Sequence, residues 1–421
     1  MKTTFKYLII VIFFISNNVS AQHEDFDQSS WIMPKDSIAL KAAKLLNVRE
    51  GTLLSDAVVI IENGIVKSVG SKLKVPNGFR VIDLGNVVLL PGLIDCHTHL
   101  VHEYGGDIHN FIDETSRKST AERVLLGTVL AREMLEAGFT TVRDLGNSGV
   151  NGDVALRDAI RAGYVPGPKM FVSTRALSPV GGQARKLTSS GLNMVQEEYV
   201  EVDGPDEAKK AVRRAIYDGA NCIKIIANNK YNYISTEEIK AIVDEAHRLG
   251  YKVAAHATGG KAVRNCIDAG VNSIEHGYDL SDEEIKLMAE KRIFLVPTDL
   301  ASSTFHQQRL ARAIKGNVLI AAGSDIYYKR ENQSRGKVAL GMFKGYAAAG
   351  MTPLQVIQTG TINAGELIGF SNRIGSVIEV GKPADIIAVK GDILKDINVL
   401  DSVGFVMRDG KVYLNKFTQD K

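Results

Sequence analysis

Cysteine is scarce in this sequence, and its scarcity excludes one class of protein. Only three of the 421 residues are cysteines, Cys96, Cys222 and Cys266, an odd number at widely separated positions. This arrangement is not that of a disulfide-stabilised scaffold, even for an exported protein. Cys96 and Cys222 lie in apolar segments typical of core strands, so we expect small buried side chains there rather than nucleophiles.

A strong net charge and a membrane-spanning segment are also missing. The formal net charge is +3 and no dense basic run is present, so neither nucleic acid nor an anionic membrane is an expected partner. The apolar run at residues 7–15 contains nine residues, whereas a helix that spans a bilayer needs about 20. We therefore expect no stable membrane insertion.

The first 21 residues have the pattern of a secretory signal peptide. Lys2 and Lys6 form a basic start, the apolar run follows, and the small residues at 19–21 resemble a cleavage site. We expect cleavage near Ala21 and export of the mature protein, either to a periplasm or out of the cell. No cysteine lies near the cleavage site, so a lipid anchor is not expected.

The rest of the chain alternates short apolar strands with helical stretches. Apolar residues make up 45% and charged residues 24% of the sequence, which is ordinary for a globular protein. The expected strands are 92–97, 140–144, 169–174, 222–227, 252–257, 273–276, 293–297 and 318–323. Helical periodicity fills the gaps, as at 119–136 and 236–248, the second with a capping start at Ser235. Eight such strands predict an α/β fold, the (β/α)8 TIM barrel.

Both flanks of this region have the texture of β-structure. Asn63-Gly64 and Asp409-Gly410 each stand between apolar runs, which is a strong hairpin signal. Neither flank is long enough for a core of its own, so we expect the two chain ends to build one small β-sandwich. The expected domains are a signal peptide at 1–21, sandwich halves at 36–91 and 367–415, and a barrel at 92–366.

Two histidines close the first barrel strand. His97 and His99 are two residues apart, and residues two apart in a strand point to the same side, about 6–7 Å from each other. This spacing allows both imidazoles to bind one metal ion, although the motif alone also fits a hydrogen-bonded histidine pair.

Four more residues suited to metal binding lie in or just after later strands. They are Lys224, His256, His276 and Asp325. Each has an ordinary alternative: a core histidine, a lysine paired with a buried acid, or a helix-capping aspartate. All six, however, fall where a barrel gathers its active-site residues. The sequence therefore favours a metal site over six separate structural roles.

These motifs resemble those of the amidohydrolase superfamily. The resemblance rests on Pro91-Gly92-Leu93-Ile94-Asp95 followed by His97 and His99, on the strand lysine, and on the later histidines and aspartate. Residues 138–146 and 273–277 are similar to the Xaa-Pro dipeptidase-like and imidazolonepropionase-related branch. The resemblance covers essentially the whole mature chain.

Several roles follow from this resemblance. It implies that His97, His99 and Asp325 hold one divalent ion, that His256 and His276 hold a second, and that a carboxylated Lys224 bridges them. Nitrogen and oxygen ligands make zinc the default metal. The resemblance also implies a metal-bridging hydroxide as nucleophile, with Asp325 as the catalytic proton carrier.

The chain departs from the branch pattern around the expected substrate. Gln183 stands where members often carry histidine, Thr258 replaces an aromatic or histidine, and the loop 228–233 is not glycine-rich. We expect Gln183 to contact substrate. Tyr231 is expected to donate to the developing oxyanion, with surface packing as its alternative.

Charged residues on the catalytic-side loops suggest a zwitterionic substrate. One or two of the basic ones are expected to bind a carboxylate and the rest to be solvated charges; they are Arg175, Arg185, Lys186, Lys230, Lys329 and Arg330. The acidic ones, expected to meet a free amino group, are Glu103, Asp107 and Asp299.

The leading hypothesis is an exported binuclear metallohydrolase that cleaves a C–N amide bond of a dipeptide (Xaa-Pro or similar) or an N-acyl amino acid. One alternative is a cyclic-amide hydrolase of the imidazolonepropionase type or a mononuclear deaminase. Another is a secreted binding protein that kept the barrel without its chemistry. The number of metal ions per chain separates the three, and self-association stays open.

Overall fold

The computed structural model describes residues 36–184, 186–300 and 304–417 of the 421. The expected signal peptide at 1–21 and Arg185 lie outside these described residues. Within them, no helix is both long and apolar enough to span a bilayer.

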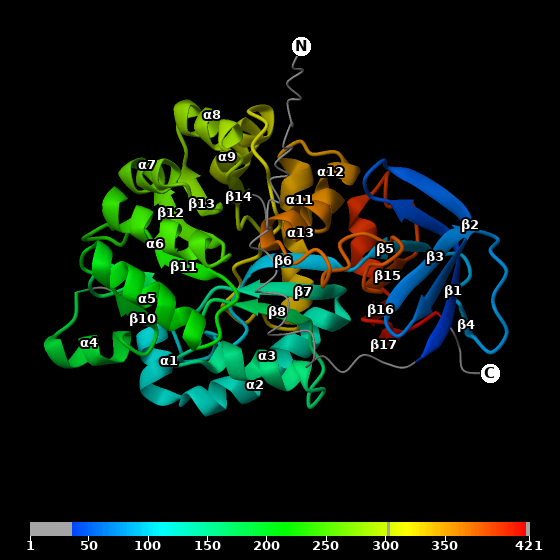
Figure 1. Cartoon of the computed structure of the whole chain (residues 1–421), viewed down its shortest axis with the longest axis horizontal. Coiled ribbons are helices and arrows are strands. Elements are labelled where there is room, and N and C mark those ends of the chain that lie inside the picture. Colours follow the sequence, from blue (N-terminus) through cyan, green and yellow to red (C-terminus); the bar gives the residue numbers. More distant parts are fainter. Residues whose placement is uncertain (1–35, 185, 301–303, 418–421) are drawn as a thin grey trace, which may run out of the picture. The chain divides into compact units, whose positions relative to one another are not determined.

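Strands from the two ends of the chain share one eight-stranded sheet (Figure 1). Its members are β1 (Ser37–Asn47), β2 (Thr52–Glu62), β3 (Ile65–Ser71), β4 (Arg80–Asp83), β5 (Val88–Pro91), β15 (Ile386–Val389), β16 (Phe405–Arg408) and β17 (Lys411–Asn415). The two ends meet where β15 pairs antiparallel with β5, opposite Leu89 and Leu90. Buried side chains such as Ile38, Val59 and Phe405 pack together on this sheet.

Both predicted hairpins are confirmed. Asn63 and Gly64 connect β2 to β3 with φ values of 51° and 75°, and Asp409 and Gly410 connect β16 to β17 with 50° and 76°. Two successive residues with positive φ form the turn whose twist matches that of the flanking strands.

Parallel strands build the middle of the chain. A three-stranded sheet contains β6 (Leu93–Thr98), β7 (Phe139–Asp144) and β8 (Lys169–Val172). A six-stranded sheet contains β9 (Ala176–Ser178), β10 (Tyr199–Glu201), β11 (Ile223–Ile226), β12 (Val253–Gly259), β13 (Ser273–Asp279) and β14 (Phe294–Val296). Most of their side chains are buried, as expected for a parallel sheet that is covered on both faces.

Backbone hydrogen bonds connect these two parallel sheets at both edges. The Asn221 N–H donates to the Val172 carbonyl at 2.7 Å on one side. On the other, Ile320 bridges Leu295, and the Cys96 N–H donates to the Ala322 carbonyl at 2.7 Å. The result is a TIM-barrel-like α/β arrangement.

Two of the expected strands differ in detail. The segment 318–323 has no continuous ladder, because the Ala322 N–H donates to the Thr359 carbonyl instead of to β6. The strand expected at 169–174 ends at Val172, and Thr174 adopts a φ of 60°; the chain then enters β9, which pairs with β11.

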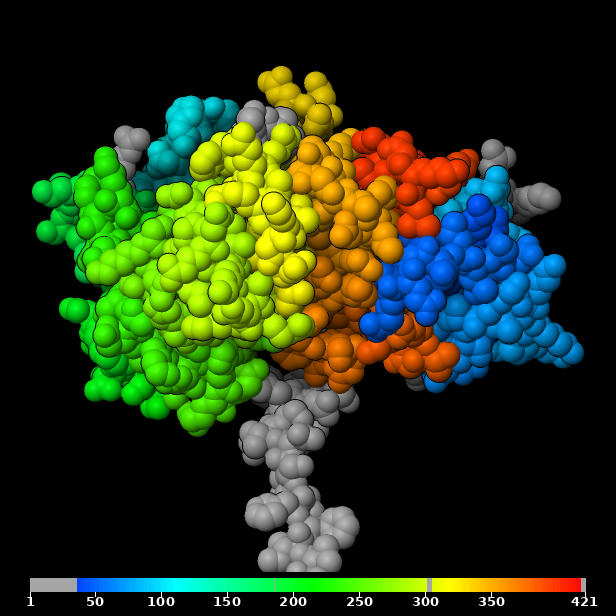
Figure 2. All heavy atoms as spheres, turned by 90° about the horizontal axis from the view of Figure 1, so that it is seen from above, coloured from blue at the N-terminus to red at the C-terminus, as the bar shows by residue number. Residues whose placement is uncertain are grey.

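Helices surround the parallel strands, whereas the eight-stranded mixed sheet also contacts β7 directly through β16. The helices are α1 (Phe111–Arg117), α2 (Thr120–Glu136), α3 (Gly152–Arg161), α4 (Ser189–Val195), α5 (Pro205–Tyr217), α6 (Thr236–Arg248), α7 (Gly260–Ala269), α8 (Asp282–Glu290), α9 (Thr304–Lys315), α10 (Arg335–Ala339), α11 (Gly341–Ala348), α12 (Pro353–Thr359) and α13 (Ile362–Ile368). The capping start of α6 is confirmed: Ser235 accepts from the Glu238 N–H, and Glu238 reciprocates. In Figure 2 the orange helices α11–α13 lie between the green-yellow helices and the blue N-terminal strands.

The three cysteines are buried, unpaired thiols; burial was predicted for Cys96 and Cys222. Burial raises the pKa of Cys96 and of Cys222 to about 12, so neither forms a thiolate at neutral pH.

Candidate metal centre and substrate cavity

All six residues expected as metal ligands line one cavity of about 360 Å³, and Gln183 lines it too. The six are His97, His99, Lys224, His256, His276 and Asp325. They come from β6, β11, β12, β13 and the segment after residue 323, so separate elements bring them together.

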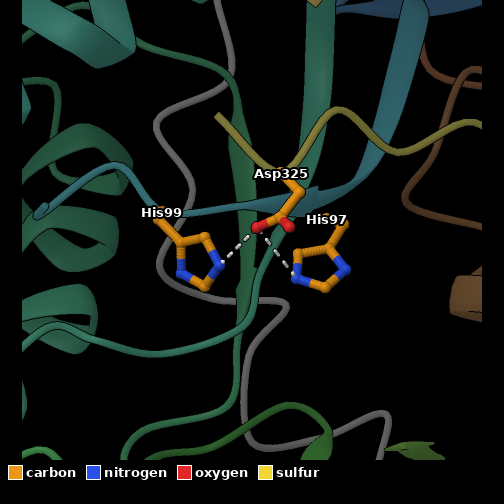
Figure 3. A group of neighbouring side chains, drawn as sticks. All are labelled: His97, His99 and Asp325. Carbon is orange, nitrogen blue, oxygen red and sulfur yellow. Dashed lines mark ion pairs between the residues drawn. The ribbon is translucent and has the colours of Figure 1, made fainter. Parts of the chain in front are cut away.

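His97, His99 and Asp325 form the tightest group (Figure 3). Oδ1 of Asp325 lies 3.1 Å from Nε2 of His99 and 3.6 Å from Nε2 of His97. Among the described residues, these three offer ligand atoms that all lie within 4.8 Å of one another. Two imidazole nitrogens and a carboxylate oxygen suit zinc and similar divalent ions.

His256 and His276 lie beside this group. Their ring centroids are 4.6 Å apart, and the His276 ring lies 5.2 Å from that of His97. Nδ1 of His276 is 3.7 Å from Oδ2 of Asp325, so the carboxylate lies close to His276 as well as to His97 and His99.

Burial sets the charge states of these groups. It lowers the pKa of His256 to about 3, assisted by the charge of Lys224, and lowers the pKa of His276 well below the usual value. Burial also lowers the pKa of Lys224 to about 8, although Glu275 and Asp325 oppose the shift. Neutral imidazoles are the metal-binding form of histidine.

Asp325 and His99 form a hydrogen-bonded pair in the same setting. Burial opposes the charge of each, but their mutual hydrogen bond and attraction raise the pKa of His99 above its usual value. His97 and His99 likewise hold the pKa of Asp325 below its ordinary value against the effect of burial. Asp325 is therefore a carboxylate at neutral pH.

A buried polar layer behind the histidines was missed by sequence reasoning. Glu275 accepts a hydrogen bond from Nδ1 of His97 at 2.8 Å and from Nη2 of Arg143 at 2.8 Å. The Gly146 carbonyl accepts from Nδ1 of His99 at 2.8 Å. Because Nδ1 of each ring is engaged by one of these acceptors, Nε2 is the ring nitrogen that faces Asp325 and is placed to bind a metal ion.

Four residues near the carboxyl ends of the parallel strands or of the segment 318–323 have an unusual backbone, and one of them, His276, lies within β13. Thr174, His276, Thr298 and Asp325 all have φ values between 53° and 72°. This region costs a non-glycine residue about 1–3 kcal/mol and is concentrated at functional sites. Asp95 braces one of these ends, because its Oδ1 accepts from the backbone N–H groups of His97 and Ser324 at 3.0 Å each.

The model of the amidohydrolase family matches residues 88–413. This chain belongs to that family.

Its relatives act on several amides. It is 31% identical to ochratoxinase of Aspergillus niger, with 88% of this chain and 85% of the relative covered. It is 28% identical to imidazolonepropionase of Fusobacterium nucleatum, with 82% and 87% covered. A crystal structure of a Xaa-Pro dipeptidase with methionine bound in its active site superposes with a TM-score of 0.79 at 28% identity, covering 90% of this chain and all of that one. The amidohydrolase is thus an enzyme that hydrolyses C–N bonds.

Of the two residues expected to bind substrate in this amidohydrolase, one lines the cavity and the other does not. Gln183 lines the cavity, and its Nε2 lies 3.3 Å from Nδ1 of His256. Tyr231 has 59% of its surface exposed and is not among the described residues that line the cavity. Its ring instead lies 5.8 Å from the Lys230 ammonium, which fits the alternative of surface packing.

None of the loop charges expected to bind a zwitterionic substrate lines the cavity, as far as the described residues show. Glu103 pairs with Arg335 at 3.1 Å, Asp107 with Arg117 at 2.9 Å, and Asp299 with Arg309 at 2.7 Å. The three acids are therefore paired within the protein, and the expected pairing of both substrate ends with side-chain charges stays a prediction.

Proposed function

We propose that this amidohydrolase uses two divalent ions to cleave the amide bond of a dipeptide or an N-acyl amino acid. The observation that supports it is that all six expected ligand residues line one cavity. The relatives named above, a Xaa-Pro dipeptidase among them, point to the same reaction class.

The residues present fit a pair of divalent ions. Four imidazoles, a carboxylate and a buried lysine supply nitrogen and oxygen donors, and burial keeps His97, His256 and His276 in their neutral, metal-binding form. Such ions, when bound, lower the pKa of a bound water and polarise a carbonyl oxygen. Zinc is the metal that this donor set favours.

Lys224 is suited to become the shared anionic ligand. With its pKa lowered to about 8, part of the population carries a neutral amine at neutral pH. The amine nitrogen adds to the carbon of CO2, and the loss of one N–H proton leaves a carbamate anion. The product replaces a buried ammonium with a bidentate oxygen ligand, which removes the cost of burying an uncompensated positive charge.

Asp325 is the proton carrier in this proposal. Its carboxylate lies close to three of the four histidines, and its lowered pKa leaves it ionised and able to accept a proton from the attacking water. The same group then delivers the proton to the leaving amine nitrogen. Glu275 and the Gly146 carbonyl hold His97 and His99 in place, and the Gln183 amide lies at the cavity wall, where it can donate to the substrate.

We also propose a closed barrel, a small domain built from both chain ends, and export of the protein. A closed (β/α)8 barrel at 92–366 is supported by the hydrogen bonds that join both sheet edges. The pairing of β5 with β15 in one sheet supports the association of 36–91 with 367–415, and their arrangement as a sandwich stays a prediction. Export is supported by the basic, apolar and small residues at 1–21.

A cyclic-amide hydrolase or a mononuclear deaminase is the second candidate, favoured by the likeness to imidazolonepropionase. The metal content of the purified protein distinguishes them. We expect close to two ions per chain in the wild type and a sharp loss in Lys224→Ala, whereas Lys240→Ala, which removes an exposed lysine on α6, keeps both.

Bicarbonate during metal reconstitution should raise occupancy in the wild type and not in Lys224→Ala. Asp325→Asn should lower turnover by about 10²–10⁴-fold, the usual contribution of a general acid–base group. One ion per chain in the wild type, unchanged by Lys224→Ala, would favour the second candidate.

A further inference from the structure

The cavity beyond the six ligand residues is aromatic and uncharged. Its lining includes Tyr104, Phe111, Tyr199, Tyr278 and Tyr327. None of the other described residues around it is a lysine, arginine, aspartate or glutamate. The part of a bound substrate that extends beyond the metal centre therefore contacts ring surfaces and neutral hydrogen-bonding groups.

Tyr104 and Tyr327 form one wall next to His99. Their ring centroids are 5.3 Å apart at 68°, and the Tyr327 ring lies 6.4 Å from that of His99. The backbone holds the two loops together, because the Tyr104 N–H donates to the Tyr327 carbonyl at 2.7 Å and the Lys329 N–H to the Tyr104 carbonyl at 2.8 Å. The His102 ring supports Tyr104 from a centroid distance of 4.5 Å. The wall is thus preorganised, not a chance contact of mobile side chains.

Neutral groups form a second side of the cavity. Asn147 donates to the Tyr199 hydroxyl at 3.0 Å, and that hydroxyl donates to Oε1 of Gln183 at 3.0 Å. The chain of bonds turns the Gln183 amide nitrogen towards His256, where it can donate to a substrate carbonyl. Phe111 packs edge-on against Tyr199 at 5.8 Å.

We propose that the cavity selects an amide with a planar aromatic group beside the scissile bond, packed against Tyr104 and Tyr327, and pairs no substrate carboxylate with a basic side chain. The proposal rests on the proposed amide hydrolysis and names its substrate class. Aromatic rings gain from edge-to-face and offset contacts at centroid distances of 4.5–7 Å, which a saturated ring of similar volume does not offer.

The test compares flat with puckered rings of equal carbon number. One pair is N-benzoylglycine and N-(cyclohexanecarbonyl)glycine; the other is N-acetylphenylalanine and N-acetylcyclohexylalanine. For the metal-loaded wild type we expect kcat/KM to favour the aromatic member about tenfold in at least one pair. Tyr327→Leu or Tyr104→Leu should bring that ratio close to one, Tyr327→Phe should keep it, and Tyr164→Leu, on the exposed surface, should leave it unchanged.

Equal rates within both pairs, or a preference that survives in both leucine variants, would overturn the proposal while amide hydrolysis itself stands. Conversion of the acids to their primary amides should change kcat/KM by less than about threefold; a loss of tenfold or more would overturn the part about the carboxylate. If no amide is hydrolysed, the proposed function fails, and the wall is still tested by calorimetry. Benzylphosphonate should then bind about tenfold more tightly than cyclohexylmethylphosphonate, and equal binding would overturn the proposal.

Discussion

The orientation of single side chains decides whether this cavity can bind metal. His97 and His99 are each fixed in one orientation. A carboxylate and a carbonyl accept hydrogen bonds from their Nδ1 atoms, so Nε2 of each ring faces Asp325. Glu275 also accepts hydrogen bonds at its other carboxylate oxygen, from Arg143 and from the Ser273 hydroxyl. A fully buried carboxylate with three donors is well satisfied and therefore rigid.

Replacement of Glu275 should weaken metal binding without touching a ligand. In Glu275→Gln, one oxygen becomes an NH2 group, so the side chain can no longer accept from both His97 and Arg143. We expect metal affinity to fall about 10–100-fold, the usual effect of losing a residue that orients a metal-binding histidine.

Competition with a chelator measures this affinity. Glu290→Gln, which changes an exposed glutamate on α8, is the matched control and should bind metal normally. Equal affinities for the two variants would show that Glu275 does not orient His97.

At the scale of elements, the ends of the parallel strands carry the site. Sequence patterns predicted this level well: most expected barrel strands lie within one or two residues of those observed, and α6 spans the predicted 236–248. Apolar runs of four to seven residues separated by capped helices leave few alternatives to parallel strands. The six ligand candidates were likewise visible, because strand ends in such a fold converge.

Other features have no local signal. The strands β9 and β10 have three residues each and form only through their neighbours. The left-handed φ of Thr174 and Thr298 opposes the preference of a β-branched residue, so only the tertiary structure imposes it. The aromatic wall joins Tyr104 and Tyr327 across more than 200 residues, and Tyr231, in a similar loop, does not reach the cavity. The loop charges suggested a zwitterionic substrate, because the sequence does not reveal which of these charges pair with other residues of the protein.

Gly323 lies in the segment that leads to Asp325, and this segment packs tightly against the strand that carries His97. A methyl group there would lie 2.3 Å from Cγ1 of Val296 and 2.9 Å from Cβ of His97. We expect Gly323→Ala to push β6 away from the segment that carries Asp325, to lower metal content, and to destabilise the fold by about 1–3 kcal/mol, as overpacking usually does.

Metal analysis and thermal unfolding check this prediction. Gly191→Ala is the control, because its added methyl group approaches only the Leu187 side chain, at 3.2 Å or more. Normal metal content in Gly323→Ala would mean that the strand end tolerates displacement.

At the scale of the whole molecule, the barrel-like region and the mixed sheet are joined by buried charge. Lys169 of β8 lies 2.8 Å from Oδ2 of Asp385 and 2.6 Å from Oδ1 of Asp409, and it donates to the Arg373 carbonyl at 2.8 Å. Burial disfavours its charge, but the two carboxylates outweigh this and raise the pKa of Lys169 above its ordinary value. Burial raises the pKa of Asp409, against the attraction of Lys169.

Removal of this ammonium should therefore destabilise the whole fold. Lys169→Met keeps the volume of the side chain but leaves the two buried carboxylates with only Arg408 among the described residues, 3.7 Å from Oδ2 of Asp409, as a counter-charge. Breaking a buried ion pair in this way commonly costs about 3–5 kcal/mol. Lys344→Met breaks a 2.6 Å pair with Asp401 whose side chains are 44% and 52% exposed, and it should cost less than about 1 kcal/mol.

The pH dependence of this loss identifies its cause. Burial raises the pKa of Asp409 and Lys169 opposes this, so without Lys169 Asp409 binds its proton more tightly in the folded than in the unfolded chain, and folding is favoured as the pH falls. Urea unfolding should show a smaller gap between Lys169→Met and the wild type at about pH 5 than at about pH 8. A gap that is the same at both pH values would mean that lost packing, and not unpaired charge, destabilises the variant. Adding Asp385→Asn to Lys169→Met should recover part of the stability at the higher pH, because it removes one of the two stranded charges.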